Sequence, residues 1–251
     1  MKKFFSILAI LGLALTFTGH FAMAADPILV VTINIPPGTT GQVVGTLLQQ
    51  PSVTVTDSAN GGAVVPGATV TVSADTGTEA SITGTKTCIT NASGVCTFTN
   101  LGYITTDAFT LKFTATKDGA TPNSITAGSM TFVASTPHTL TIVTPPTTTV
   151  DGTVDTILTP NTVINAKDQY GNNCQNGVQI VAALDTGMGT LRGTTTVAIA
   201  GGEGNATFTD LGYSKSGETF KLSFDAVTGD AEAVVSDSIA ALKAGNPYTL
   251  T

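Results

Sequence analysis

The sequence predicts an all-β protein made of two β-sandwiches in tandem, preceded by a cleavable signal peptide. Three observations support this prediction: the chain repeats itself at an offset of 110 residues, apolar and polar residues alternate in short runs, and no segment after the leader has a helical period. With 251 residues, the chain is long enough for two domains of ordinary size. Hydrophobic residues make up 41% of it, so each half can form a packed core.

Residues 1–24 have the features of a secretory signal peptide. Lys2 and Lys3 form a positive start, residues 4–17 form an apolar run, and residues 22–24 (AMA) are a small-x-small cleavage site. The apolar run is too short to span a membrane, and no later stretch is apolar enough to do so. We therefore expect an exported protein, located extracellularly or at the cell surface, with the periplasm as its route.

The repeat divides the rest of the chain. Residues 96–103 (CTFTNLGY) match residues 206–213 (ATFTDLGY), and Pro137–Thr141 is nearly identical to Pro247–Thr251. This predicts a first sandwich over residues 25–136 and a second over residues 137–246. Residues 247–251 would then be the start of a third repeat, or a free or donated strand.

Short runs within each repeat have the period of half-buried strands. Residues 53–57, 68–72, 109–113 and 220–224 alternate apolar and polar side chains, and Val and Thr dominate them. Gly, Asn, Asp and Pro separate such runs at the roughly 8–12-residue spacing that is typical of sandwiches. In these runs the Phe and Leu side chains should face the core.

The charge pattern limits the partners. Charged residues make up 11% of the chain and its formal charge is −7; loss of Lys2 and Lys3 with the leader would make it −9. Nucleic-acid binding usually requires clustered Lys and Arg, which this chain lacks. We expect another protein, a cell-surface ligand or self-association, with no nucleic acid and no membrane span in the mature chain.

Several segments resemble a known family. Residues 168–172 (DQYGN), 187–194 (GMGTLRGT), 206–211 (ATFTDL) and 220–222 (FKL) resemble bacterial immunoglobulin-like repeats of the invasin and intimin kind, and the first repeat has a looser version in residues 67–72, 84–85 and 94–101. The resemblance implies immunoglobulin-like sandwiches that serve as a spacer or adhesive module of a surface or secreted protein.

The chain also departs from the immunoglobulin pattern. It contains no Trp, so the buried tryptophan of antibody domains is absent. Phe109 and Phe220 occupy the places where a corner tyrosine would be expected. We therefore expect the hydroxyl-to-backbone bond of that tyrosine to be lost.

The three cysteines form an odd set for an exported chain. Cys88 and Cys96 flank the turn at residues 91–94 and would face each other across a hairpin, where a disulfide would fix strand register. Cys174 lies in the predicted turn at residues 172–176. It is expected to be an unpaired thiol or, alternatively, to form an intermolecular disulfide.

No catalytic machinery is visible, so we expect no enzyme and no cofactor. Only His138 remains after loss of the leader, and neither a nucleophile elbow nor a zinc-binding helix motif is present. Asp57 and Asp168 recur between the repeats at strand ends, where turn capping explains them. Calcium at the domain junction is a weaker alternative, because the dense Asp pattern of a calcium loop is missing.

These features favour a structural or adhesive surface module. The alternative is a subunit of an extracellular fibre, assembled by donation of the strand Pro247, Tyr248, Thr249, Leu250 and Thr251. A carbohydrate-active accessory domain is a third hypothesis, but four Tyr and no Trp offer little for stacking on sugars.

Overall fold

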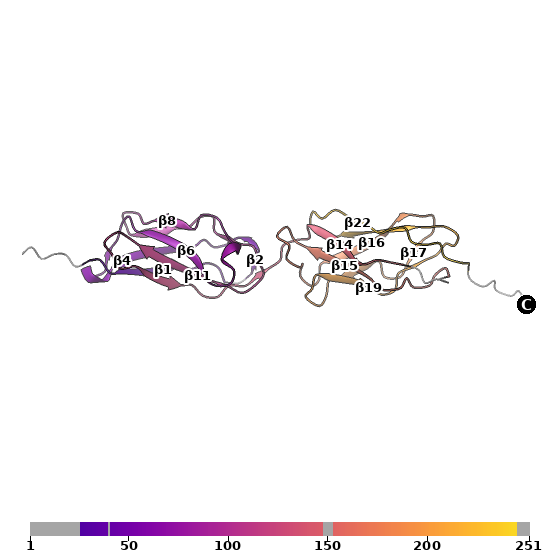
Figure 1. Cartoon of the computed structure of the whole chain (residues 1–251), viewed down its shortest axis with the longest axis horizontal. Coiled ribbons are helices and arrows are strands. Elements are labelled where there is room, and N and C mark those ends of the chain that lie inside the picture. The colour runs from indigo at the N-terminus through magenta and orange to yellow at the C-terminus, as the bar shows by residue number, and fades with distance from the viewer. Residues whose placement is uncertain (1–25, 40, 148–152, 245–251) are drawn as a thin grey trace, which may run out of the picture.

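The computed structural model describes residues 26–39, 41–147 and 153–244. The expected signal peptide and the segment Pro247–Thr251 lie outside this range, so the predictions about them stay predictions. Figure 1 shows two β-rich units placed end to end along the long axis. We call residues 26–136 unit 1 and residues 137–244 unit 2. Within the described ranges, no helix is long and apolar enough to cross a membrane.

Unit 1 is a sandwich of two antiparallel sheets. The first has the order β1-β4-β5, with β9 also pairing with β4, and the second has the order β12-β11-β6-β8. A small sheet β3-β10-β7 and a parallel pair β13-β2 complete the unit. The elements are β1 Leu29–Ile35, β2 Gln42–Val43, β3 Gly45–Thr46, β4 Ser52–Asp57, the 3-10 helix η1 Ser58–Asn60, β5 Ala63–Val64, β6 Thr69–Thr76, the 3-10 helix η2 Glu79–Ser81, β7 Ile82–Thr83, β8 Thr87–Ile89, β9 Val95–Thr97, β10 Gly102–Tyr103, β11 Thr110–Thr116, β12 Asn123–Thr126 and β13 Phe132–Val133.

Unit 2 repeats this plan with shorter edges. Its sheets have the orders β14-β15-β19 and β18-β16-β21-β22, and β17 pairs with β20. The strands are β14 Thr139–Thr144, β15 Thr162–Lys167, β16 Gln179–Thr186, β17 Leu191–Arg192, β18 Thr196–Ala198, β19 Asn205–Phe208, β20 Gly212–Tyr213, β21 Lys221–Ala226 and β22 Val234–Val235. Together the two units confirm the predicted tandem all-β sandwiches.

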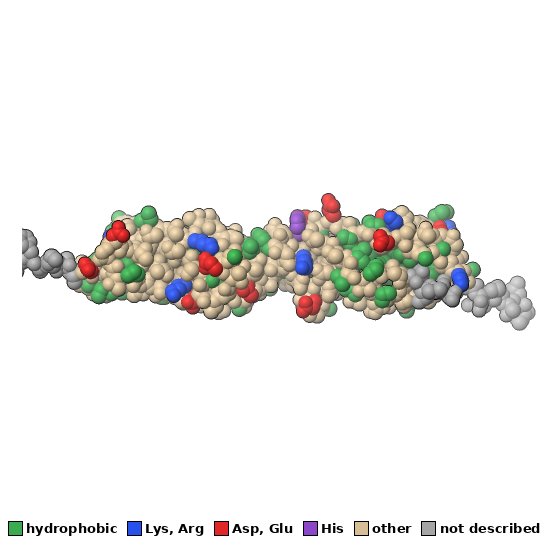
Figure 2. All heavy atoms as spheres, viewed as in Figure 1, with side chains coloured by type: hydrophobic (Ala, Val, Ile, Leu, Met, Phe, Trp, Pro, Cys, Tyr) green, Lys and Arg blue, Asp and Glu red, His purple; other side chains and the backbone are tan. Residues whose placement is uncertain are grey.

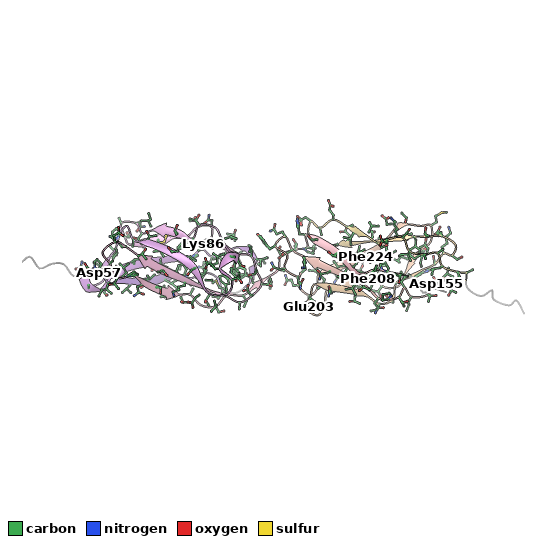
Figure 3. The ribbon with its side chains drawn as sticks, in the orientation of Figure 1. Asp57, Lys86, Asp155, Glu203, Phe208 and Phe224 are labelled. Carbon is green, nitrogen blue, oxygen red and sulfur yellow. A yellow bond between two sulfur atoms is a disulfide. The ribbon has the colours of Figure 1, made fainter. Side chains whose placement is uncertain are left out.

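Where apolar and polar residues alternate in the sequence, the apolar side chains of the strand are buried in the core. In β11, Leu111 and Phe113 are buried while Lys112 between them is half-buried on the opposite face. The same pattern places Leu222 and Phe224 of β21 in the core of unit 2. Figure 3 labels Phe224 and Phe208 in the interior of unit 2, where their ring centroids lie 5.4 Å apart.

Each unit has its own core. One cluster of buried residues runs from Leu29 to Phe132, and the next runs from Leu140 to Leu242. These two clusters support a domain limit at Thr136-Pro137, which remains our proposal.

A repeated Gly-Thr pair has a packing reason. Gly84 and Gly193 have φ of +86° and +89°, and a Cβ on either would lie 2.0 Å from the backbone oxygen of Asn100 or Asp210. The next amide in each unit, Thr85 or Thr194, donates to the side chain of the same Asn or Asp at 2.9 Å. Only glycine permits this close approach.

The disulfide joins Cys88 and Cys96, as the sequence predicts. Its place in the fold corrects the hairpin prediction. Cys88 lies in β8, which pairs with β6, whereas Cys96 lies in β9, which pairs with β4 of the other sheet. The chain changes sheets in the turn at residues 90–94, so the bond joins the two sheets and does not fix a hairpin register.

The expected loss of a tyrosine-to-backbone bond is also wrong. Tyr103 and Tyr213 are fully buried and stack on Phe109 and Phe220, with ring centroids 3.5 and 3.9 Å apart. Their hydroxyls accept hydrogen bonds from backbone N–H groups, Thr78 in unit 1 at 3.1 Å and Gly189 in unit 2 at 2.7 Å. The hydroxyl that bonds to the backbone therefore belongs to the tyrosine of the Leu-Gly-Tyr motif. This tyrosine stacks on the phenylalanine that occupies the expected position of a corner tyrosine.

Candidate functional site

The junction between the units is the most organised polar region that the two sandwiches share. Asp168, at the end of β15, is 2% exposed. Its carboxylate accepts hydrogen bonds from three backbone N–H groups: Ser135 at 3.1 Å, and Tyr170 and Asn172 at 2.9 Å each. Because a buried carboxylate needs such donors, Asp168 ties the connecting segment to the turn of unit 2.

Asn172 extends this network to unit 1. Its side-chain nitrogen donates to the Ile104 carbonyl at 2.9 Å and to both carboxylate oxygens of Asp168. Gln175 adds a longer contact, 3.4 Å from its side-chain nitrogen to the Ala134 carbonyl. The junction is therefore bridged by side-chain hydrogen bonds in addition to the connecting chain.

These residues were only partly identified from the sequence. Asp168 was interpreted as a turn cap, which it is, since it accepts from Tyr170 and Asn172. Its bond to Ser135 and the bond of Asn172 to Ile104 were missed, because they join residues 33 and 68 positions apart. The available signal was that Asp168 and Asn172 both belong to the DQYGN segment on which the family resemblance rests.

Cys174 lies beside the same network and is free. It is 1% exposed and packs in the core of unit 2, not in an open loop. Burial, together with the negative charge of Asp168, raises the pKa of its thiol to about 11. Since the thiolate is the reactive form, this cysteine is protected from exchange in the folded state. An intermolecular disulfide would require the junction to open.

One hollow of about 260 Å³ at the junction is lined by residues of both units, among them Ser135, His138 and Asp230. The His138 ring Nδ1 lies 3.1 Å from the Asp230 carboxylate, and both side chains are at least half exposed. Within the described residues, no hydrogen bond joins the Ser135 hydroxyl to the ring.

Metal binding has little support at this site. Among the residues that the structure describes, no group of three or more His, Cys, Asp or Glu side chains could hold an ion. The donors around Asp168 are backbone N–H groups and an amide, which occupy the oxygens that a calcium ion would need.

The solved structures that resemble this chain include domains of intimin, invasin and the adhesin FdeC. The D00-D0 domain of intimin is 15% identical, with 83% of this chain and 100% of that chain covered and a TM-score of 0.40. Invasin, described as a bacterial integrin-binding protein, is 18% identical, with 86% and 39% covered and a TM-score of 0.32. The Escherichia coli adhesin FdeC is 15% identical, with 86% and 65% covered and a TM-score of 0.41.

At these identities and TM-scores, the likeness carries no argument about what the chain binds or does. No protein-family model matches the chain, and no curated protein matches it.

Proposed function

We propose that the chain is an exported, non-enzymatic surface module whose two sandwiches form a stiff spacer, of the kind used in adhesive stalks. The observation that carries this proposal is the bonded junction. Asp168 holds Ser135 of the connecting segment, and Asn172 holds Ile104 of unit 1. Units that are joined only by a flexible linker move independently, whereas side-chain bonds across the junction favour one orientation.

Stiffness can be tested by small-angle X-ray scattering on the purified chain. We expect a single elongated shape for the unmodified protein. Asn172→Ala removes the bond to Ile104 and should broaden the distribution of inter-unit distances. Asn91→Ala is a matched control, because Asn91 caps a turn within unit 1 and makes no bond across the junction. Equal distributions for all three proteins would contradict the spacer proposal.

Export can be tested separately. Antibody labelling of intact cells that produce the chain should detect it at the surface or in the medium. Recovery of the chain only from the cytosolic fraction, still carrying residues 1–24, would contradict the export proposal without bearing on the stiffness of the junction.

A further inference from the structure

Unit 2 has an open seam between its two sheets. The edge strand β14 of one sheet lies opposite β22, the edge strand of the other, and between them is a hollow of about 500 Å³. Residues 138–140 line it on one side, and Asp230 and residues 232–234 line it on the other. A second hollow of about 260 Å³ continues the seam between residues 145–147 and residues 237–240.

Both walls of the seam present unpaired backbone groups. In β15, the Ala166 N–H donates to the Gly204 carbonyl, and the Ala166 carbonyl accepts from the Cys174 N–H. Leu140, its register partner in β14, therefore directs its N–H and carbonyl away from β15 and into the seam. On the other wall, the Ser236 N–H donates to the Leu222 carbonyl of β21. Because backbone groups of successive residues in a strand point to opposite sides, the N–H and carbonyl of Val235 point away from β21.

The seam also has an apolar base. Leu140 is 5% exposed, and Ile142 and Val234 are half-buried against the core. Val143 and Val235, which alternate with them, are exposed on the outer faces of β14 and β22, 57% and 46%. Figure 2 shows hydrophobic side chains gathered on the face of unit 2 that it displays, whereas the same face of unit 1 has few.

In unit 1, two backbone bonds bridge one end of the corresponding seam. The N–H of Leu29 in β1 donates to the Thr121 carbonyl at 3.1 Å, and the Thr121 N–H donates to Pro27 at 2.8 Å. The strand that follows, β12, has four residues, whereas β22 has two. Unit 2 keeps the counterpart of the second bond, because the Asp230 N–H donates to the Pro137 carbonyl at 3.1 Å. Within the described residues, the two seams therefore differ by the Leu29 bond and by the shorter last strand of unit 2.

Charge identifies the kind of occupant. Asp230, Glu232 and Asp237 lie along the two hollows, whose lining includes no Lys or Arg. His138 lines the larger hollow, with its ring 3.1 Å from the Asp230 carboxylate, so Glu232 and Asp237 are the acids without a basic neighbour in the lining. A second copy of this chain would bring the same acids together on a molecule whose charge is already −7. A segment with basic side chains would instead be attracted.

We propose that this seam binds an extended, basic polypeptide segment by β-strand addition. The added strand pairs its backbone with Leu140 or Val235, places small apolar side chains over the Leu140–Val234 base, and directs its basic side chains to Asp230 and Glu232. This adds a binding activity to the spacer role and does not depend on it.

The test uses fluorescein-labelled heptapeptides titrated with the purified full chain and followed by fluorescence anisotropy. The probe is Lys-Val-Thr-Val-Lys-Val-Thr. One comparison peptide has Glu in place of both Lys, and another has Pro in place of the first Thr. We expect saturable binding of the probe that weakens with added salt, and at least about tenfold weaker binding of both comparison peptides.

Variants of the chain locate the site. Val235→Pro removes an N–H that points into the seam, so it should abolish binding while leaving the β21–β22 bonds intact. Ala233→Lys, on the same exposed edge, is the second variant, and far-UV circular dichroism checks the fold of both. Asp230→Asn with Glu232→Gln should weaken binding about tenfold. Asp118→Asn, an exposed acid in unit 1, is the charge control and should leave binding unchanged.

Three results would overturn the proposal. The first is absence of saturable binding of the basic probe. The second is equal binding of all three peptides, or binding that neither Val235→Pro nor Ala233→Lys reduces. The third is a dimer in sedimentation velocity that Val235→Pro disrupts, because the occupant would then be a second copy of the chain.

Discussion

Unit 1 and unit 2 follow one plan but stabilise its margins differently. Unit 1 joins its two sheets through Cys88–Cys96, and two backbone bonds, Leu29 to Thr121 and Thr121 to Pro27, bridge the end of its seam. Unit 2 has no second cysteine to pair with Cys174, and among the described residues one such bond, Asp230 to Pro137, bridges the end of its seam. The buried tyrosine of unit 2 has the shorter bond to a carboxylate: Tyr213 donates to Glu218 at 2.5 Å, whereas Tyr103 donates to Asp107 at 3.1 Å. Glu218 also pairs with Lys215.

The shared and the divergent features lie in different places. Phe113 and Phe224, Tyr103 and Tyr213, and the stacked rings beside the tyrosines are buried equally in both units. The differences lie at edges and corners, where a substitution does not disturb the packed interior. The buried core therefore specifies the sandwich fold, whereas residues at the edges can differ between the units without disturbing that core.

The first prediction has the largest expected effect and removes the disulfide of unit 1. Replacing Cys88 and Cys96 with Ala should lower the unfolding free energy of unit 1 by about 2–3 kcal/mol, the value expected for a short closed loop, and leave unit 2 unchanged. Urea unfolding with hydrogen-exchange mass spectrometry assigns the transition to a unit.

Reduction of the unmodified chain provides the control for this first prediction. A reductant should reproduce the loss in the native chain and have no further effect on the Cys88→Ala, Cys96→Ala double variant. If unit 2 became less stable instead, the inter-sheet role of the bond would be wrong.

The second prediction compares the two buried tyrosines. Tyr213→Phe leaves the Gly189 N–H without its acceptor at 2.7 Å and removes a donor to a carboxylate, so it should cost about 2 kcal/mol. Tyr103→Phe should cost about 1 kcal/mol, because its bonds to Thr78 and Asp107 are longer, 3.1 Å each. Urea midpoints at neutral pH measure both.

A third tyrosine serves as the control for this pair. Tyr170 is 40% exposed, and within the described residues its hydroxyl makes no hydrogen bond, so Tyr170→Phe should change stability little. Equal losses for Tyr103→Phe and Tyr213→Phe would show that the shorter bonds of Tyr213 add no stability.

The sequence predicted what depends on local pattern. Strands at residues 109–113 and 220–224 were predicted because alternation reports directly which side chains are buried. The spacing of Cys88 and Cys96 predicts the disulfide. It does not predict that the two cysteines lie in different sheets, because the chain changes sheets within the turn between them. Spacing alone does not reveal such a crossing.

The contacts that were missed are long-range. Tyr103 reaches the Thr78 N–H across 25 positions, and Asn172 reaches Ile104 across 68. Neither pair has a local signature, although the tyrosine was present in the repeated Leu-Gly-Tyr motif. The open seam of unit 2 was also beyond the sequence, since it depends on how few residues pair in β22.

The third prediction compares two buried amides of the edge strands, without a mutation. Leu29 and Leu140 are at different register positions, because Val31 pairs with Val55 as Leu140 pairs with Ala166. Both Leu29 and Leu140 are buried, but the Leu29 amide is bonded to Thr121 and the Leu140 amide faces the open seam. The Leu140 amide should exchange with solvent about tenfold faster, as expected for one missing hydrogen bond. Amide exchange followed by NMR measures this, and equal protection would mean that the seam of unit 2 is closed in solution.

The smallest expected effect is a difference in acid sensitivity. The Tyr213 hydroxyl, the Met188 N–H and Lys215 lower the pKa of Glu218 from 4.5 to about 2. A depressed carboxyl pKa stabilises the fold above the unfolded value, and this stabilisation is lost as pH falls from 4.5 towards 2. In unit 1, the Ala74 N–H and Lys86 lower the pKa of Glu79, but that carboxyl does not contact the buried tyrosine.

Unit 2 should therefore lose more stability than unit 1 as pH falls through that window, and Glu218→Gln should reduce the difference. Glu232→Gln, an exposed acid in the same unit, is the control and should leave the pH profile unchanged. The effect is the smallest of the four, because Glu218 lies at the surface, where solvent and salt screen its charge. Thermal unfolding of each unit measured across the window decides the matter: parallel profiles would mean that the tyrosine–carboxylate bond does not distinguish the two units.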